Sequence, residues 1–148
     1  MHDFKNFPEL TNGQMETEYF SSPHKQIFED FRAKCVKVTD GDTITVKWFE
    51  RDFNFPIRFL DINTKELSEG GGDVKDWLKD IIEGEEVDIL INKKNRVDKW
   101  GRLLGHIVHR GMNMGEWMLR TGKATTFANR NEGKIPELNK LTSTSQWF

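Results

Sequence analysis

The chain has 148 residues and a formal net charge of −2, with 36% hydrophobic, 11% aromatic and 31% charged residues. This length supports one domain with a hydrophobic core and excludes two domains of ordinary size, and the single cysteine excludes an intrachain disulfide. No run approaches the roughly 20 apolar residues that span a bilayer, and no signal peptide is seen at the N-terminus, so we expect a soluble, intracellular protein.

The first thirty residues read as an N-terminal extension, because polar residues dilute the apolar ones there. The stretch TNGQMETEY favours a short helix, and the Ser-Pro pair that follows interrupts any continuation. We expect residues 31–148 to form the folded domain. Residues 1–30 then offer a segment through which that domain could contact a protein partner.

Five stretches show the alternation or apolar enrichment of short strands, and they cover residues 31–38, 42–49, 54–61, 86–93 and 102–109. A helix is predicted over 73–83, because apolar residues recur there at i, i+3, i+4, i+7 and i+8. A second helix is predicted over 113–122 and a short third one near 135–142. This order matches a five-stranded Greek-key β-barrel of the OB type with two or three helices, in the α+β class.

Asp42 stands out at the start of the second strand. It has the same parity along the strand as Ile44 and Val46, which form the apolar face. An unpaired carboxylate is too costly to bury in a core. Asp42 must therefore lie at the rim of the barrel or serve a site.

Cations gather in the stretch INKKNRVDKWGR, which holds five of them against one aspartate. The cations are Lys93, Lys94, Arg96, Lys99 and Arg102. A solvated loop is one interpretation of such a run, and a rim that follows the phosphates of a nucleic acid is the other. The net charge alone does not favour a nucleic-acid binder, so the interpretation depends on where these cations lie.

Hydrolysis of a phosphodiester requires hard oxygen ligands for a cation, a base for the attacking water, and cationic donors for the charged transition state. Arginine suits the last role because its planar donors can bind two phosphate oxygens at once. The ends of the expected strands carry all three kinds of group. Asp42 begins the second strand, Arg58 and Glu66 bracket the end of the third, and Arg102 begins the fifth.

Four pieces of sequence then occur in a characteristic order: DGDT (40–43), IRFLDINTKE (57–66), DKWGR (98–102) and NMGEWMLRTGKA (113–124). Together they make the chain resemble the staphylococcal nuclease-like, or thermonuclease, family over residues 34–124. Members of this family are OB-barrel nucleases that use calcium to hydrolyse DNA and RNA. The resemblance implies a Ca²⁺-dependent endonuclease that acts on nucleic acid.

The resemblance also implies a metal site. Asp42 would ligate Ca²⁺ or another divalent cation, Asp40 would lie in the outer shell, and Thr64 would contribute its backbone carbonyl. Asn63 occupies the position at which the best-known members of the family carry a second metal-binding aspartate. Its amide oxygen can still ligate a cation, but the lost negative charge predicts weaker or altered metal binding.

The same resemblance implies roles for five further residues. Arg58 and Arg102 would bind the scissile phosphate and its transition state, and Glu66 would orient or deprotonate the attacking water. Lys99 and Trp100 would line the nucleotide pocket. Trp100 stands where the family often has a tyrosine, and an indole can also stack on a base.

Simpler explanations exist for the single residues. Arg58 and Glu66 could form a surface ion pair, and the Asp40–Asp42 stretch could be an ordinary hairpin turn. For the whole chain, the alternative to a nuclease is a catalytically degenerate OB module that binds single-stranded nucleic acid or a protein partner. Asn63 and the acidic balance favour that alternative. The presence of Glu66 with both arginines favours the enzyme, since a binding module needs no carboxylate to orient water.

Overall fold

The computed structural model describes residues 2–64, 72–99 and 101–126. Its elements are α1 (Asn12–Glu18), η1 (Tyr19–Ser21), β1 (Phe31–Asp40), β2 (Thr43–Lys47), β3 (Phe55–Phe59), β4 (Ile62–Asn63), α2 (Gly72–Ile82), β5 (Glu86–Leu90), β6 (Leu103–His109), β7 (Met112–Asn113), α3 (Met114–Arg120) and β8 (Thr125–Thr126). The expected helix near 135–142 lies outside the described residues. Within the described part, no helix is both long and apolar enough to cross a lipid bilayer.

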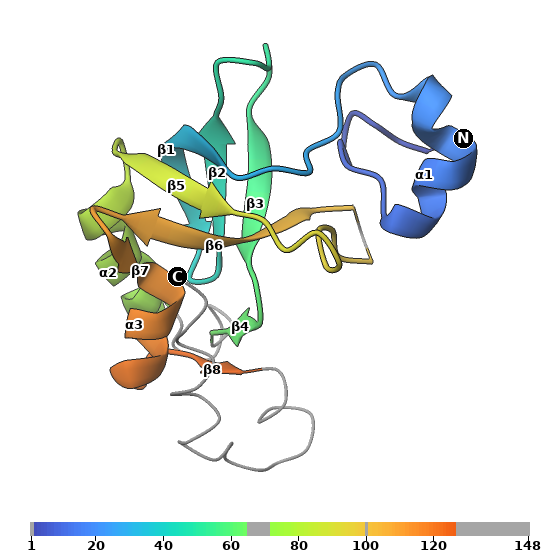
Figure 1. The fold of residues 1–148 in the computed structure, drawn as a ribbon. Coiled ribbons are helices and arrows are strands. Elements are labelled where there is room, and N and C mark those ends of the chain that lie inside the picture. The colour runs from blue at the N-terminus through green and yellow to red at the C-terminus, as the bar shows by residue number, and fades with distance from the viewer. Residues whose placement is uncertain (1, 65–71, 100, 127–148) are drawn as a thin grey trace.

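Five strands form a closed barrel (Figure 1). β1 pairs antiparallel with β2 and with β5, β2 pairs antiparallel with β3, and β5 pairs antiparallel with β6. A parallel pairing of β3 with β6 closes the barrel. The predicted five-stranded OB-type barrel of the α+β class is therefore confirmed.

The barrel core consists of the side chains that alternate inward along the strands, such as Ile44 and Val46 of β2 and Ile57 of β3, all of which are fully buried. The apolar stripe of α2 adds Leu78 and Ile82 to the same core, with the helix lying against β1. α3 lies against β6. Both helices end two residues before the glycines that the sequence offers as stops.

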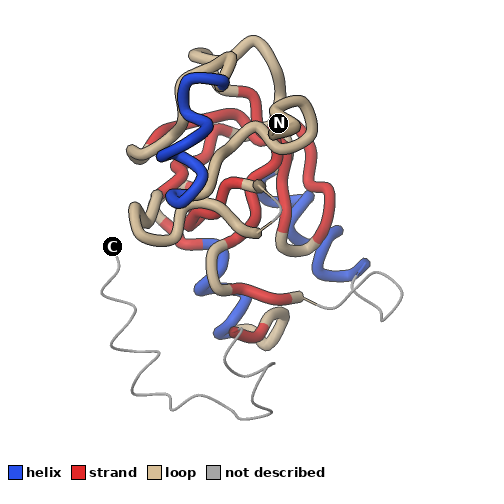
Figure 2. The backbone as a smooth tube through the Cα atoms, turned by 90° about the vertical axis from the view of Figure 1, so that its right-hand side faces the viewer, coloured by secondary structure: helices blue, strands red, loops and turns tan. Residues whose placement is uncertain are grey.

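Residues 2–30, called here the N-terminal arm, pack against one side of the barrel (Figure 1). Figure 2, in which this side faces the viewer, shows α1 in front of the barrel strands. The predicted short helix is confirmed as α1, and Thr11 caps it by accepting a hydrogen bond from the Gln14 amide. The arm buries Leu10 and Ile27 completely or nearly so. It is therefore packed against the domain through part of its length.

A second, two-stranded sheet joins β4 and β8, with Asn63 opposite Thr125 and Ile62 opposite Thr126. Each of these strands has only two residues, which is too short for any alternating pattern to predict. The pairing brings the chain that follows α3 beside Asn63, one of the expected site residues.

Candidate active site

A pocket of about 630 Å³ opens at the end of the barrel where β2 begins and β3 ends. The barrel side of its wall includes Asp42, Arg58 and Asn63. Lys99 and Arg102, from the connection between β5 and β6, complete the wall. Asp40 and Thr64 also line the pocket. The structure thus brings together seven of the residues that the sequence selects.

Strand pairing places Asp42 beside Arg58. In the β2–β3 ladder Thr43 is opposite Arg58, and the Phe59 amide donates a hydrogen bond of 2.9 Å to the Asp42 carbonyl oxygen. Thr43 also donates its hydroxyl to Asp42 Oδ1 at 3.1 Å. The position of Asp42 on the apolar face of its strand predicted that it lies at the rim of the barrel or in a site. It lies at the rim, half-buried in the wall of the pocket.

The turn before Asp42 packs closely against Thr64. A Cβ atom at Gly41 would lie 2.7 Å from Thr64 Oγ1 and 3.1 Å from a methyl carbon of Val74. Distances below about 3 Å are not tolerated, so only glycine fits here without a shift. The absent side chain lets the Asp40–Asp42 turn approach the end of β4, where Asn63 and Thr64 lie.

Arg58 is only 8% exposed, and its guanidinium group lies between two oxygen acceptors. Nη2 donates to Asn63 Oδ1 at 2.9 Å and to Asp42 Oδ2 at 3.3 Å. Nη1 donates to the Phe59 carbonyl oxygen at 3.3 Å. These contacts fix the plane of the guanidinium at the pocket wall, and burial strengthens its field there.

Arg102 belongs to a hairpin, called here the 96–104 hairpin, whose described residues are 96–99 and 101–104. The Leu104 amide donates to the Arg96 carbonyl at 2.7 Å, and the Asp98 amide donates to the Arg102 carbonyl at 2.9 Å. The Asp98 carboxylate accepts hydrogen bonds from Arg102 Nε at 2.7 Å and from the Arg102 amide at 2.9 Å. The Arg102 side chain keeps 29% of its surface exposed, so it is oriented and still accessible from the pocket.

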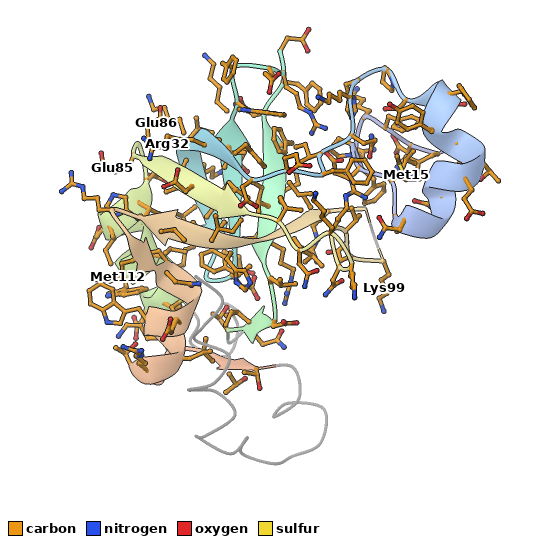
Figure 3. The ribbon with its side chains drawn as sticks, in the orientation of Figure 1. Met15, Arg32, Glu85, Glu86, Lys99 and Met112 are labelled. Atoms are coloured by element: carbon orange, nitrogen blue, oxygen red, sulfur yellow. The ribbon has the colours of Figure 1, made fainter. Side chains whose placement is uncertain are left out.

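Asp98 was not selected from the sequence as a site residue, although its spacing of four from Arg102 is a usable signal for an ion pair. Figure 3 shows Lys99 near the tip of the hairpin, pointing away from the barrel. The basic run is therefore neither wholly solvated nor wholly part of a phosphate-binding rim. Lys99 and Arg102 line the pocket, whereas Arg96 is 1% exposed and faces the N-terminal arm.

The oxygen donors at the pocket wall fit a hard divalent cation. Asp42 supplies a carboxylate, Asn63 an amide oxygen and Thr64 a backbone carbonyl, all of which are ligand types that Ca²⁺ accepts. A carboxylate or amide oxygen carries two lone pairs, so accepting a hydrogen bond from Arg58 does not by itself prevent Asp42 or Asn63 from ligating a cation. Among the described residues, no three acidic, histidine or cysteine side chains form a group that could hold a metal, so any cation there would also need the amide, carbonyl or water oxygens.

Two of the expected site residues, Glu66 and Trp100, lie outside the described residues. The first is expected to act on water and the second to stack on a base. Thr64, two residues before Glu66, and Lys99, the residue before Trp100, are described, and both line the pocket.

Comparison with known proteins identifies the family of this chain. The family model for staphylococcal nuclease homologues matches residues 56–146, a stretch that excludes the N-terminal arm. Two uncharacterized endonucleases, from Escherichia coli O157:H7 and Escherichia coli, are each 30% identical over 108 residues, 72% of this chain and 67% of theirs. An uncharacterized protein of Bacillus anthracis is 26% identical over 101 residues, 64% of this chain and 46% of its own. The chain therefore belongs to the staphylococcal nuclease homologue family.

Proposed function

We propose that the protein is a metal-dependent endonuclease that hydrolyses phosphodiester bonds of DNA, RNA or both. The observation that carries this proposal is the convergence of Arg58, Asp42 and Asn63 with Arg102 around one pocket. A guanidinium group can bind a phosphate, and the oxygen atoms beside it can ligate the cation that accompanies the phosphate. Membership in a nuclease family supports the same reaction class.

In the proposed reaction Arg58 and Arg102 bind the scissile phosphate from two different elements, the barrel and the hairpin. Both donate to the phosphoryl oxygens as negative charge develops in the transition state. Glu66 orients the attacking water or accepts its proton. Lys99 and Trp100 bind the adjoining nucleotide, the first through charge and the second by stacking.

Asp42, Asn63 and the Thr64 carbonyl would hold the cation, with Asp40 in its outer shell. A bound Ca²⁺, or another divalent cation, supplies Lewis-acid polarisation of a phosphoryl oxygen. Asp40 accepts a hydrogen bond of 2.7 Å from the Gly41 amide, which fixes its carboxylate beside the turn. With one aspartate fewer than the best-known relatives, the site has less negative charge to attract the cation.

One observation favours a second function, that of a degenerate module that binds nucleic acid without cutting it. Arg58 donates a hydrogen bond of 2.9 Å to Asn63, the residue that stands in place of a carboxylate. A site in which this oxygen serves only Arg58 would bind a phosphate through the arginine and hold no catalytic cation. A protein partner bound to the N-terminal arm would also be consistent with a module that binds without cutting.

The test is cleavage of supercoiled plasmid and of labelled oligonucleotides with calcium, magnesium, manganese or a chelator. Glu66→Gln is compared with Glu86→Gln, a matched control whose glutamate is exposed and lies at the opposite end of the barrel from Lys99 (Figure 3). We expect metal-dependent cutting that only Glu66→Gln abolishes. Equal rates in wild type and Glu66→Gln would refute the role of Glu66. Oligonucleotide binding without cutting under any metal would favour the binding module.

A further inference from the structure

The N-terminal arm contacts the hairpin that carries Arg102 at both of its ends. The arm follows the side of the barrel toward which the connection between β5 and β6 extends (Figure 1). Just before the hairpin, Asn12 of the arm donates its side-chain amide to the Lys93 carbonyl oxygen at 3.1 Å. Further contacts lie at the base and at the tip of the hairpin, and they come from different parts of the arm.

At the base, Arg96 is enclosed by the arm. Its Nε donates to the Ile27 carbonyl at 2.7 Å, and its Nη1 donates to the Leu10 carbonyl at 3.1 Å and to Asn12 Oδ1 at 3.0 Å. The guanidinium also lies 3.9 Å from the centre of the Phe28 ring. The backbone of this same residue pairs with Leu104 across the hairpin, so the arm holds the first residue of the hairpin in place.

Glu9 supplies the charge that makes this burial possible. The residue is 0% exposed, and its carboxylate lies 2.6 Å from Arg51 Nη2 and 3.7 Å from Arg96 Nη2. Burial lowers the pKa of both guanidinium groups, and the negative charge of Glu9 opposes that shift. Without this carboxylate two buried cations would face each other with only carbonyl oxygens and aromatic rings around them.

At the tip, the arm touches Gly101, the residue before Arg102. Gly101 has φ of +95°, and a Cβ atom there would lie 2.6 Å from Phe7 Cβ and 3.4 Å from the Glu9 carbonyl oxygen. The arm backbone and Phe7 therefore lie directly against the turn of the hairpin. This turn also carries Asp98, whose carboxylate orients the Arg102 side chain.

We propose that the N-terminal arm is a positioning element of the active site, in which Phe7 and Glu9 are positioning residues that hold the 96–104 hairpin, and with it Arg102, at the pocket. The hairpin has two restrained ends, so Arg102 keeps one orientation toward a bound phosphate. Loss of either restraint lets the hairpin move relative to Arg58. A displacement of about 1 Å at a catalytic group can cost up to 10²-fold in rate.

The catalytic part of this inference rests on the proposed nuclease function, so the experiment has two independent readouts. Phe7→Ala removes the contact at the tip, and Phe4→Ala is its matched control. Phe4 is a half-buried phenylalanine of the same arm whose ring contacts are with His2 and His24 rather than with the hairpin. Glu9→Gln, which keeps the shape and removes the charge, tests the base of the hairpin in the same full-length chain.

The first readout is amide hydrogen exchange of residues 96–104, with β1 as the internal reference. We expect Phe7→Ala to raise exchange in the hairpin on the order of tenfold and to leave β1 unchanged. The second readout is metal-dependent cleavage. We expect kcat to fall about tenfold and KM to stay within about twofold, because Arg102 acts on the transition state. Phe4→Ala should match wild type in both readouts.

Unchanged exchange in the hairpin for both Phe7→Ala and Glu9→Gln would overturn the proposal. Faster exchange with an unchanged kcat would also overturn it, because the restraint would then have no bearing on the reaction. A change in Phe4→Ala as large as in Phe7→Ala would show a general loosening of the arm and would overturn it as well. Faster hairpin exchange in a protein that cleaves no nucleic acid would support the restraint and overturn the nuclease instead.

Discussion

Arg58 and Arg96 are both almost completely buried, and they lie in opposite kinds of environment. Arg96, at the junction of arm and barrel, is surrounded by carbonyl oxygens, an aromatic ring and Glu9. Arg58, in the barrel wall, is held by two side-chain oxygens and one carbonyl, but it faces a pocket of about 630 Å³. Similar burial therefore serves two different purposes.

The difference lies in what a ligand can reach. The hydrogen-bond acceptors of Arg96 are oxygens of the N-terminal arm, so this cation contributes to stability and to the position of the hairpin. Asp42 and Asn63 hold Arg58 from the edge of an open space, so a phosphate can approach its guanidinium without unfolding anything. The depth of burial alone does not separate a structural arginine from a candidate functional one, and the adjoining cavity is what makes Arg58 the candidate.

The largest expected effect follows from removal of the pocket arginine. Arg58→Ala should lower the cleavage rate roughly 10²- to 10³-fold, because a preorganised donor to the transition state is lost. Single-turnover cleavage at saturating metal measures it. Arg32→Ala is the matched control, since Arg32 is an exposed arginine paired with Asp88 far from the pocket. A loss of less than tenfold in Arg58→Ala would remove Arg58 from the proposed site.

Removal of a junction arginine should act on stability instead. Arg51→Met leaves the buried Glu9 carboxylate without its 2.6 Å partner, and breaking a buried pair in this way costs about 3–5 kcal/mol. Urea unfolding measures the loss. Arg32→Met should leave the unfolding midpoint unchanged, because its ion pair is exposed. If Arg51→Met unfolded like wild type, the junction would contribute no stability and the contrast between the two regions would fail.

A smaller change should sharpen the pocket side of the comparison. Asn63→Asp restores a carboxylate beside Asp42 and Arg58, and we expect metal affinity to rise about tenfold, equivalent to about 1.4 kcal/mol. Calorimetric titration with Ca²⁺ measures it. Asn63→Ala should weaken binding, because the oxygen is lost altogether. Equal affinities in wild type and both variants would show that residue 63 is not a ligand.

The smallest expected effect is a pH dependence of stability. Burial lowers the pKa of His24, on the arm, and of His106, on β6. The unfolded chain therefore binds these protons more readily, so stability is full above about pH 6.5 and falls as the pH drops toward the folded-state pKa values. Urea midpoints at pH 7.5 and pH 5 should differ in this direction. The double variant His24→Gln/His106→Gln should flatten the difference, and an unchanged slope would exclude these groups as its cause.

Most of the barrel could be predicted from the sequence, because period-two alternation and the stripe of α2 are local signals. Several residues of the pocket wall could also be predicted, since Asp42 breaks the pattern of its strand and Arg58 and Arg102 stand at the ends of expected strands. The two-residue strands β4 and β8 could not be predicted, because two residues are too few to show an alternating pattern.

The junction was missed for a different reason. Glu9 sits in the stretch FPEL, and its partners Arg51 and Arg96 lie in separate loops far along the chain. Arg96 stands among four other cations, so its charge suggested solvent or phosphate rather than a buried carboxylate. Local composition cannot separate these cases, because the energy of a buried ion pair depends on contacts that only the tertiary structure creates.

The parallel pairing of β3 with β6 has a consequence for how the chain acquires its activity. This pairing joins segments separated by β4, α2 and β5, and long loops are entropically costly to close before their contacts form. Arg58 lies on the first of these strands, and Arg102 immediately precedes the second. The two arginines are therefore brought to one pocket only when the pairing of β3 with β6 closes the barrel. A chain in which β3 and β6 have not yet paired therefore lacks the assembled pocket.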